Sequence, residues 1–165
     1  MAAEGVGADA HLWTEAGVNP DSGYGLKLAR GVKHTAAFPL SSAAKGDFSK
    51  LLVNLHQPVI NGLSDVFQGY ATYGQYLYVF KGTSYEKSGG KVNSEVTSVD
   101  MKTGTIQQGP LLTKAGESLS SREPEGVAVY VTASGEPRLF LGFAAGTKAG
   151  QRRSHLYYKN EPVRK

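Results

Sequence analysis

The sequence contains no cysteine in its 165 residues. A disulfide framework, a thiolate metal site and a cysteine nucleophile are therefore excluded. Long apolar runs are also missing, because no window approaches the roughly 18 consecutive apolar residues that a membrane-spanning helix needs. The N-terminal stretch MAAEGVGADAHLW has neither the basic start nor the apolar core of a secretory signal. We expect no membrane span in this chain.

Strong net charge is absent as well. The formal charge is only +4, so the sequence does not predict a nucleic-acid partner. Positive side chains gather toward the C-terminal end, at Arg152, Arg153, Lys159, Arg164 and Lys165. This basic end is typical of a solvated tail, and the alternative is an anion-binding patch.

Glycine and tyrosine are abundant, with 21 and 9 residues respectively, and short apolar runs alternate with Gly, Ser, Asn and Lys. This pattern favours strands and turns over helices. A chain of this length with 40% apolar residues can bury one real core. We therefore expect a single all-β domain over residues 1–165.

Two segments of the chain repeat the same order of strands. QGYATY and EGVAVY share Gly and Ala at matching positions, and each is followed by a second and a third apolar strand. The corresponding ranges are 68–73, 76–82 and 94–100 in one unit, and 125–130, 138–146 and 154–160 in the other. The segments 4–7, 11–16 and 25–31 read as a third copy with a shortened first strand.

Repeats of strands at a fixed period are the sequence mark of β-propeller blades. The blade-like units span about residues 4–50, 66–107 and 122–160, and chance similarity among the strands of a sandwich is the alternative. The propeller interpretation predicts that 68–73 and 125–130 are buried innermost strands, side by side in separate sheets. It also predicts that Gly126→Val overpacks the point where the blades converge.

Several long motifs also resemble a known family. HLWTEAGVNPDSGYGLKLAR, FQGYATYGQYLYVFKGTSY, SLSSREPEGVAVY and EPRLFLGFAAG are similar to the β-propeller domain of teichoic-acid biosynthesis protein C-like proteins, which occurs in Gram-positive secreted proteins and phage receptor-binding proteins. The resemblance implies a propeller that binds cell-wall polymers or host-surface glycans, at a secreted or cell-surface location. Only residues 32–42 separate GLKLARG from AAKGDFSKLL, where about one more blade is expected, so the chain resembles a shortened member.

Candidate ligand-binding residues come from position and chemistry, because the resemblance supplies no catalytic motif. Aromatic faces stack on sugar rings, while carboxylates, amides and guanidinium groups bind hydroxyls or phosphate. Residues of these types at expected strand ends and loops are Trp13, Glu15, Gln68, Tyr70, Tyr85, Arg122, Glu123 and Glu125. For each aromatic residue taken alone, core packing between sheets is the favoured interpretation and ligand binding is the alternative.

No metal site and no cofactor are predicted. The four histidines, His11, His34, His56 and His155, share no close ligand spacing along the chain. Glu123 and Glu125 are two residues apart, a spacing that also permits paired acid and base chemistry. Pro124 makes a structural loop an equal explanation.

Three functions remain open on these grounds. The first is a non-catalytic domain that binds carbohydrate or an anionic wall polymer. The second is an enzyme that uses the propeller mouth in cell-wall or secondary metabolism. The third is a structural protein in which about three blade units per chain form a homo-oligomer, most simply a dimer, because a propeller needs about four or more blades to close.

Overall fold

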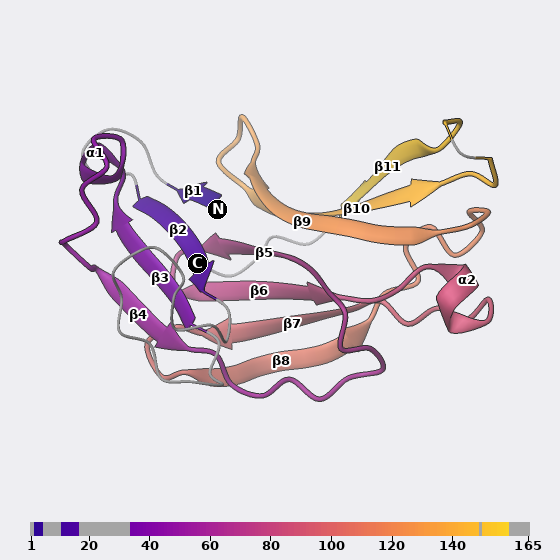
Figure 1. Cartoon of the computed structure of the whole chain (residues 1–165), viewed down its shortest axis with the longest axis horizontal. Helices are drawn as coiled ribbons and strands as arrows, with labels where there is room; N and C mark the ends of the chain where they lie inside the picture. The colour runs from indigo at the N-terminus through magenta and orange to yellow at the C-terminus, as the bar shows by residue number, and fades with distance from the viewer. Residues whose placement is uncertain (1, 5–10, 17–33, 149, 159–165) are drawn as a thin grey trace. The chain divides into compact units, whose positions relative to one another are not determined.

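The computed structural model describes residues 2–4, 11–16, 34–148 and 150–158, and the first two of these segments are described by backbone alone. The all-β expectation is confirmed, since the described residues form strands and only two short helices, α1 (Leu40–Ala43) and α2 (Tyr85–Ser88). The strands make three separate antiparallel sheets (Figure 1). Within the described residues no sheet closes into a barrel and no closed propeller is present. Neither helix is long and apolar enough to cross a membrane.

The chain divides into two compact units, Met1–Pro58 and Val59–Lys165. The first unit contains one sheet in the order β1-β2-β3-β4. Its strands are β1 (Ala2–Glu4), β2 (His11–Ala16), β3 (His34–Pro39) and β4 (Val53–His56).

The strand predicted over residues 11–16 is confirmed as β2. The segments 5–7 and 25–31, where neighbouring strands were expected, lie outside the described residues. β3 pairs with β2 on the side opposite β1, so the interval 32–42 contains a strand that the sequence interpretation did not assign. Its first five residues are all buried, which removes the alternation of polar and apolar residues that marks a strand with one exposed face.

The second unit contains two sheets, one with four strands and one with three. The first has the order β5 (Phe67–Tyr73), β6 (Tyr76–Lys81), β7 (Glu95–Asp100) and β8 (Thr105–Leu112). The second has the order β11 (Arg153–Tyr158), β10 (Pro137–Ala145) and β9 (Glu123–Val131). Six of these strands confirm the strands that the repeats predicted, with ends shifted by at most about two residues, although 159–160 of the last predicted range lie outside the described residues. β8 is the one that the sequence did not indicate.

The two sheets of this unit repeat one register. In the first sheet Ala71 pairs with Tyr78, and in the second Ala128 pairs with Phe140. Two residues further along the same strands, Gly126 pairs with Gly142, as Gly69 pairs with Phe80 in the first sheet. The repeat seen in the sequence is therefore also a repeat of strand pairing.

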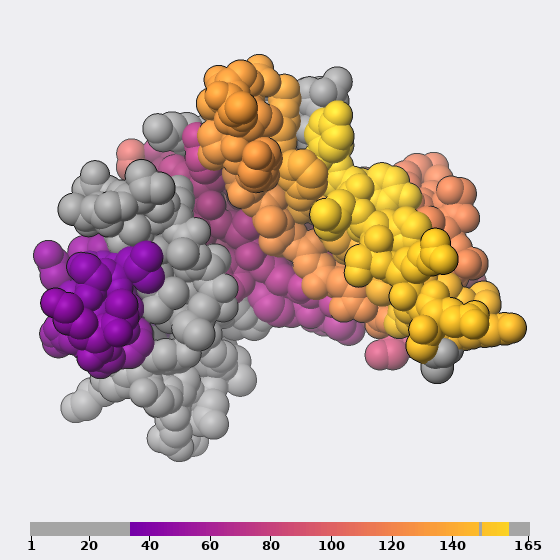
Figure 2. Space-filling model, turned by 90° about the horizontal axis from the view of Figure 1, so that it is seen from above, coloured from indigo at the N-terminus to yellow at the C-terminus, as the bar shows by residue number. Residues whose placement is uncertain are grey.

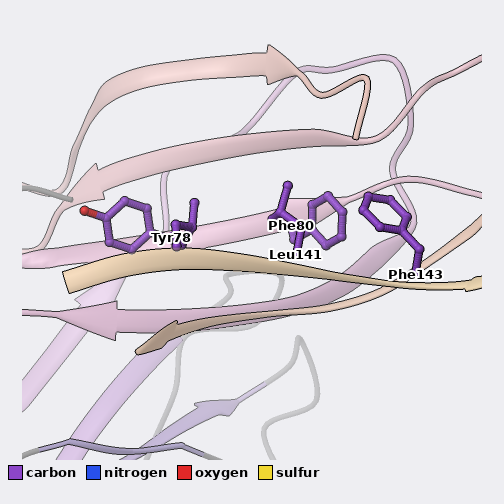
Figure 3. Packing of buried hydrophobic residues seen from close by; sticks show 5 residues of the cluster. Tyr78, Phe80, Leu141 and Phe143 are labelled. Carbon is purple, nitrogen blue, oxygen red and sulfur yellow. The ribbon is translucent and has the colours of Figure 1, made fainter. Parts of the chain in front are cut away.

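A hydrophobic core joins the two sheets (Figure 3). Tyr78 and Phe80 of β6 pack against Leu141 and Phe143 of β10. The rings of Phe80 and Phe143 meet edge to face, with their centroids 5.8 Å apart. Burying each such large apolar side chain contributes roughly 1.5–3 kcal/mol, so this layer fixes the three-stranded sheet on the four-stranded one.

The first strands of the two sheets, β5 and β9, lie side by side as predicted, in separate sheets. A Cβ atom placed on Gly69 would make ordinary contacts, the nearest at 3.5 Å to Cα of Gly126, and the φ of +152° at Gly69 is a backbone conformation that favours glycine.

The predicted burial of 125–130 is wrong, because Glu125, Ala128 and Tyr130 are exposed. The expected overpacking at Gly126 is wrong too, since a Cβ atom there meets nothing within 4 Å. The physical reason is that no described residue packs over this side of β9 at Gly126.

A candidate binding face on the second unit

The three-stranded sheet has one buried face and one open face. Along β10 the buried positions alternate with half-buried ones, so Leu139, Leu141 and Phe143 point to the core and their neighbours point away. We call the open side the outer face (Figure 2, where β9 is orange and β11 is yellow). Strand pairing places on it Glu123, Gly126, Ala128, Tyr130, Arg138, Phe140, Gly142, Ala144, Ser154, Leu156 and Tyr158.

The middle of the outer face is a floor of small residues. Gly126 lies opposite Gly142, and Ala144 lies opposite Ser154. A Cβ atom on Gly142 would make ordinary contacts, the nearest at 3.6 Å to the carbonyl oxygen of Gly126, whereas one on Gly126 would enter open space. A ligand can therefore approach the backbone of this floor closely.

Aromatic side chains occupy one end of the outer face. Tyr130, Phe140 and Tyr158 come from three adjacent strands, and the two tyrosines are 60% and 58% exposed. The ring of Phe140 lies 6.1 Å from that of Tyr130 and 5.5 Å from that of Tyr158, measured between centroids. Leu156 is 72% exposed beside them. Such an exposed apolar surface on a folded domain is typical of an interaction site.

A charged group lies at the other end, where β9 begins. Nη1 of Arg152 donates a hydrogen bond of 2.6 Å to Oε2 of Glu123, and both side chains are partly exposed. Nη2 of Arg152 reaches the carbonyl oxygens of Ser121 and Ala144 at 3.4 and 3.5 Å. The hydrogen bond that Arg152 donates to Glu123 is the main cause that raises the pKa of Arg152, with smaller contributions from Glu125 and Glu86.

Negative charge dominates this group. Three carboxylates, those of Glu86, Glu123 and Glu125, act on the single guanidinium of Arg152, and we call these four residues the carboxylate cluster. Hydrogen bonding from Ser121 lowers the pKa of Glu86, so that carboxylate is ionised at neutral pH. Ser121 itself has a positive φ of 50°, a backbone conformation that residues other than glycine rarely adopt.

The two ends of the outer face lie within reach of one extended ligand. Phe140 at the aromatic end and Ala144 beside the carboxylate cluster are on the same strand. At about 3.3 Å per residue, their separation along the strand is roughly 13 Å.

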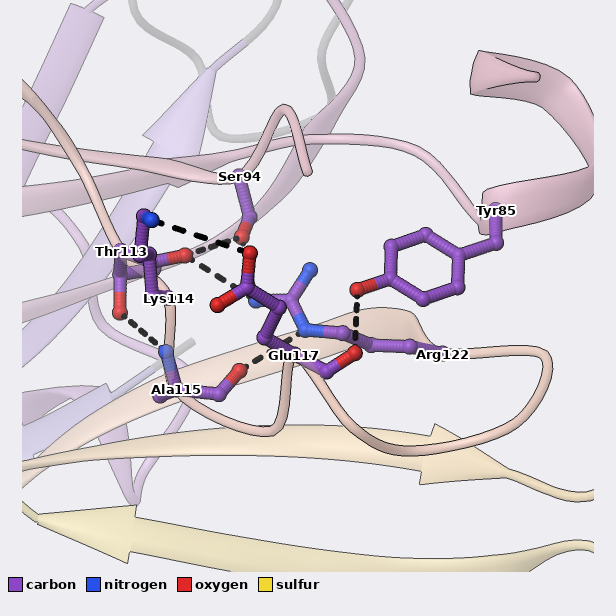
Figure 4. A network of polar contacts seen from close by, with 7 residues as sticks. All are labelled: Tyr85, Ser94, Thr113, Lys114, Ala115, Glu117 and Arg122. Carbon is purple, nitrogen blue, oxygen red and sulfur yellow. Dashed lines mark hydrogen bonds and ion pairs between the residues drawn. The ribbon is translucent and has the colours of Figure 1, made fainter. Parts of the chain in front are cut away.

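Arg122, which the sequence proposed for ligand binding, is fully buried. Its Nε donates to the carbonyl oxygen of Ala115 at 2.8 Å, and its Nη2 donates to Oγ of Ser94 at 2.6 Å and to the carbonyl oxygen of Thr113 at 3.3 Å (Figure 4). These bonds join the start of β9 to the end of the four-stranded sheet. Arg122 thus holds the segment before β9 in place and exposes no atom to a ligand.

Aromatic rings complete the surroundings of the Arg122 guanidinium. Its central carbon lies 4.0 Å from the centroid of Phe143 and 5.9 Å from that of Tyr85. Nη1 has no hydrogen-bond partner among the described residues. Burial lowers the pKa of Arg122, and the nearby Tyr85 and Glu117 partly offset that effect.

Gln68, Tyr70 and Tyr85 of the predicted set are likewise held by the chain. Nε2 of Gln68 donates to the carbonyl oxygen of Gly82 at 2.8 Å. The hydroxyl of Tyr85 donates to the backbone carbonyl oxygen of Glu117 at 2.8 Å. Tyr70 is half-buried on the four-stranded sheet, with its ring 6.4 Å from that of Phe67. None of these three residues belongs to the outer face.

Trp13 and Glu15 lie in β2 of the first unit, and their side chains fall outside what the structure describes. Of the eight predicted site residues, the structure brings Glu123 to the outer face with Arg152, and Glu125, which is exposed and has no partner in the register of β9 with β10, acts electrostatically on the same guanidinium.

The sequence interpretation missed the aromatic end and the role of Arg152. Strict alternation in RLFLGFAAG could have placed Phe140 on the side opposite Leu139 and Leu141. Arg152 was read as part of a solvated tail, and nothing in the sequence pairs it with Glu123.

No protein-family model matches the chain, and a search of curated proteins finds no match. Among the described residues, no three histidine, aspartate or glutamate side chains gather where they could hold a metal ion. The outer face therefore has to be interpreted from its own chemistry.

Proposed function

We propose that this protein is a non-catalytic carbohydrate-binding domain, and that the outer face is its binding surface. The observation that carries the proposal is the pairing, on one open sheet face, of exposed aromatic rings with a carboxylate cluster and a floor of small residues between them. This combination supplies the two kinds of contact that sugars use. The resemblance of the sequence to propellers that bind wall polymers or surface glycans also supports a carbohydrate ligand.

The aromatic end would bind the apolar face of a sugar ring. Tyr130 and Tyr158 keep more than half of their surface exposed, so stacking a sugar on them buries area that is now in water. The open Gly126 floor lets the rest of the ligand lie flat against the sheet.

The carboxylate cluster would bind sugar hydroxyls. Carboxylate oxygens accept hydrogen bonds and the Arg152 guanidinium donates them, so the group offers both roles. Because three carboxylates face one guanidinium, the local field repels phosphate. Neutral or amine-bearing glycans are therefore favoured over phosphate-rich wall polymers.

The proposal is tested by calorimetry, in which a glycan that the wild type binds is titrated into each variant. Tyr158→Ala and Glu123→Gln should each weaken binding about 5- to 100-fold, in line with roughly 1–3 kcal/mol for an important contact. Phe67→Ala is the matched control, since Phe67 is a partly exposed aromatic residue on the other sheet. Equal losses for the control and the two site variants would contradict the proposed surface.

A second candidate function, assembly of a propeller from two chains, is supported by a different observation. The side of the four-stranded sheet that packs on the three-stranded sheet carries Gly69, Ala71, Tyr73, Tyr78 and Phe80. The repeat makes these equivalent to Gly126, Ala128, Tyr130, Phe140 and Gly142, which form the outer face. The outer face is thus the counterpart of a surface that already packs against a sheet, and a second copy of the chain would provide that sheet.

Light scattering after size-exclusion chromatography separates assembly from ligand binding. Assembly predicts twice the chain mass of 17.5 kDa. Leu156→Glu should return the protein to a monomer, whereas Val59→Glu, an 80% exposed position outside the outer face, should not. A wild-type monomer at micromolar concentration would rule out assembly and leave carbohydrate binding in place.

A further inference from the structure

A pair of histidines in the first unit forms a second candidate site. His34 on β3 lies directly opposite His56 on β4, and their ring centroids are 4.1 Å apart at an interplanar angle of 70°. His56 is exposed, whereas His34 is only 1% exposed. The two residues are far apart in the sequence, so only the strand pairing brings their rings together.

A hydrogen bond to Asn54 is formed on the other side of the His34 ring. Nδ1 of His34 lies 2.8 Å from Oδ1 of Asn54. In the neutral ring, a proton on Nδ1 donates to this amide oxygen and leaves Nε2 with a lone pair. Asn54 is the diagonal neighbour of His34 on the same face of the sheet.

Nε2 of His34 has no hydrogen-bond partner among the described residues, although it is buried. A buried acceptor without a donor is costly in a folded protein, by roughly 1–3 kcal/mol. An imidazole whose far nitrogen donates to a fixed oxygen is also the arrangement that metal-binding histidines show. These observations together indicate that Nε2 of His34 binds an electron-pair acceptor, such as a metal ion.

We propose that His34 and His56 bind one late first-row divalent metal ion, with Zn²⁺ and Cu²⁺ as the fitting ions. Imidazole nitrogen suits these ions, whereas Mg²⁺ and Ca²⁺ prefer oxygen ligands. His34 contributes Nε2 and His56 contributes a ring nitrogen after a side-chain rotation that its exposure permits. Asn54 is a positioning residue, and water completes the coordination. These histidines belong to the first compact unit, whereas the outer face belongs to the second.

The test uses the full chain without a histidine tag. Cu²⁺ titration followed by electron paramagnetic resonance should show one ion with hyperfine coupling to two imidazole nitrogens, and Zn²⁺ should raise the melting temperature. His56→Ala should lower the affinity for either ion at least tenfold, with an unchanged circular dichroism spectrum, because His56 is exposed. His155→Ala is the matched control, and it should bind like the wild type.

Further outcomes define the proposal. Asn54→Ala should weaken binding less than His56→Ala does, because it removes only the orientation of the ring. Binding should weaken on acidification, because imidazole must be neutral to coordinate. Wild-type affinity in His56→Ala, a spectrum with a single imidazole, or no binding of Zn²⁺ or Cu²⁺ by the wild type would overturn it.

Discussion

Replacing Arg122 tests whether the buried network holds the second unit together. Arg122→Met keeps a long apolar side chain but removes the hydrogen bonds to Ala115, Ser94 and Thr113 and the contact with the Phe143 ring. Each buried acceptor that loses its donor costs roughly 1–3 kcal/mol, and the ring contact adds up to about 2 kcal/mol.

Two effects reduce that cost. Thr113 keeps a hydrogen bond from Oγ of Ser94 at 3.4 Å, so its carbonyl oxygen is not orphaned. Removing the guanidinium also removes a buried cation whose Nη1 has no partner. We therefore expect Arg122→Met to lower the free energy of unfolding by about 2–3 kcal/mol, and Arg122→Ala by about 3–5 kcal/mol because it also leaves a cavity.

Urea denaturation followed by circular dichroism measures these changes. Arg122→Lys should cost at least as much as Arg122→Met, because a compact, strongly hydrated ammonium cannot reproduce the planar fork. Lys114→Met is the control, since Lys114 is exposed and makes only a 3.8 Å ion pair with Glu117. A loss below about 1 kcal/mol in Arg122→Met would refute the reasoning, because it would show that the hydrogen bonds and the ring contact are nearly neutral overall.

Two further predictions concern the backbone and pH. Gly82→Ala should destabilise the fold by about 2 kcal/mol or more, because its Cβ would stand 2.9 Å from both Pro124 and Ser94. Gly126→Ala, whose Cβ meets nothing within 4 Å, should change stability by less than about 0.5 kcal/mol. Denaturant midpoints of the two variants measure the difference. Hydrogen bonding lowers the folded-state pKa of Glu86, so its stabilising effect is present above the unfolded value of about 4.5 and is lost as the pH falls through the lower folded value. The melting temperature of wild type should therefore exceed that of Glu86→Gln at pH 7, and the difference should shrink as the pH falls below about 4.5. A difference that stays constant with pH would contradict this assignment.

Much of the strand pattern could be predicted from the sequence. β5, β6, β9 and β10 are apolar runs bounded by turn residues, and their observed ends lie at most about two residues from the predicted ones. β8 was missed because Gly109 and Pro110 interrupt its pattern, and an edge strand tolerates both. β4 is only four residues long and has one buried residue, so its periodicity is too weak to detect.

The site could be predicted only in part, because it depends on which side chains strand pairing brings together. Glu123 was a candidate from its position, but its partner Arg152 follows β10 by several residues and meets it only in the folded sheet. The same limit applies to His34 and His56, whose contact is set by the register of two short strands. Arginine is a residue type that often binds ligands, and only the burial of Arg122 in the folded chain shows that it has a structural role.

Gly126 offers the most direct test of the central claim, that the outer face binds carbohydrate. The side chain in Gly126→Trp would project into the open space above the small-residue floor without meeting described atoms at its Cβ. The measurement is binding of a neutral glycan, selected on a glycan array with the wild-type protein, to both forms by calorimetry. We predict that the variant keeps the wild-type circular dichroism spectrum and loses at least tenfold in affinity. Undiminished binding by Gly126→Trp, or an array on which the wild type binds no neutral or amine-bearing glycan, would contradict the account.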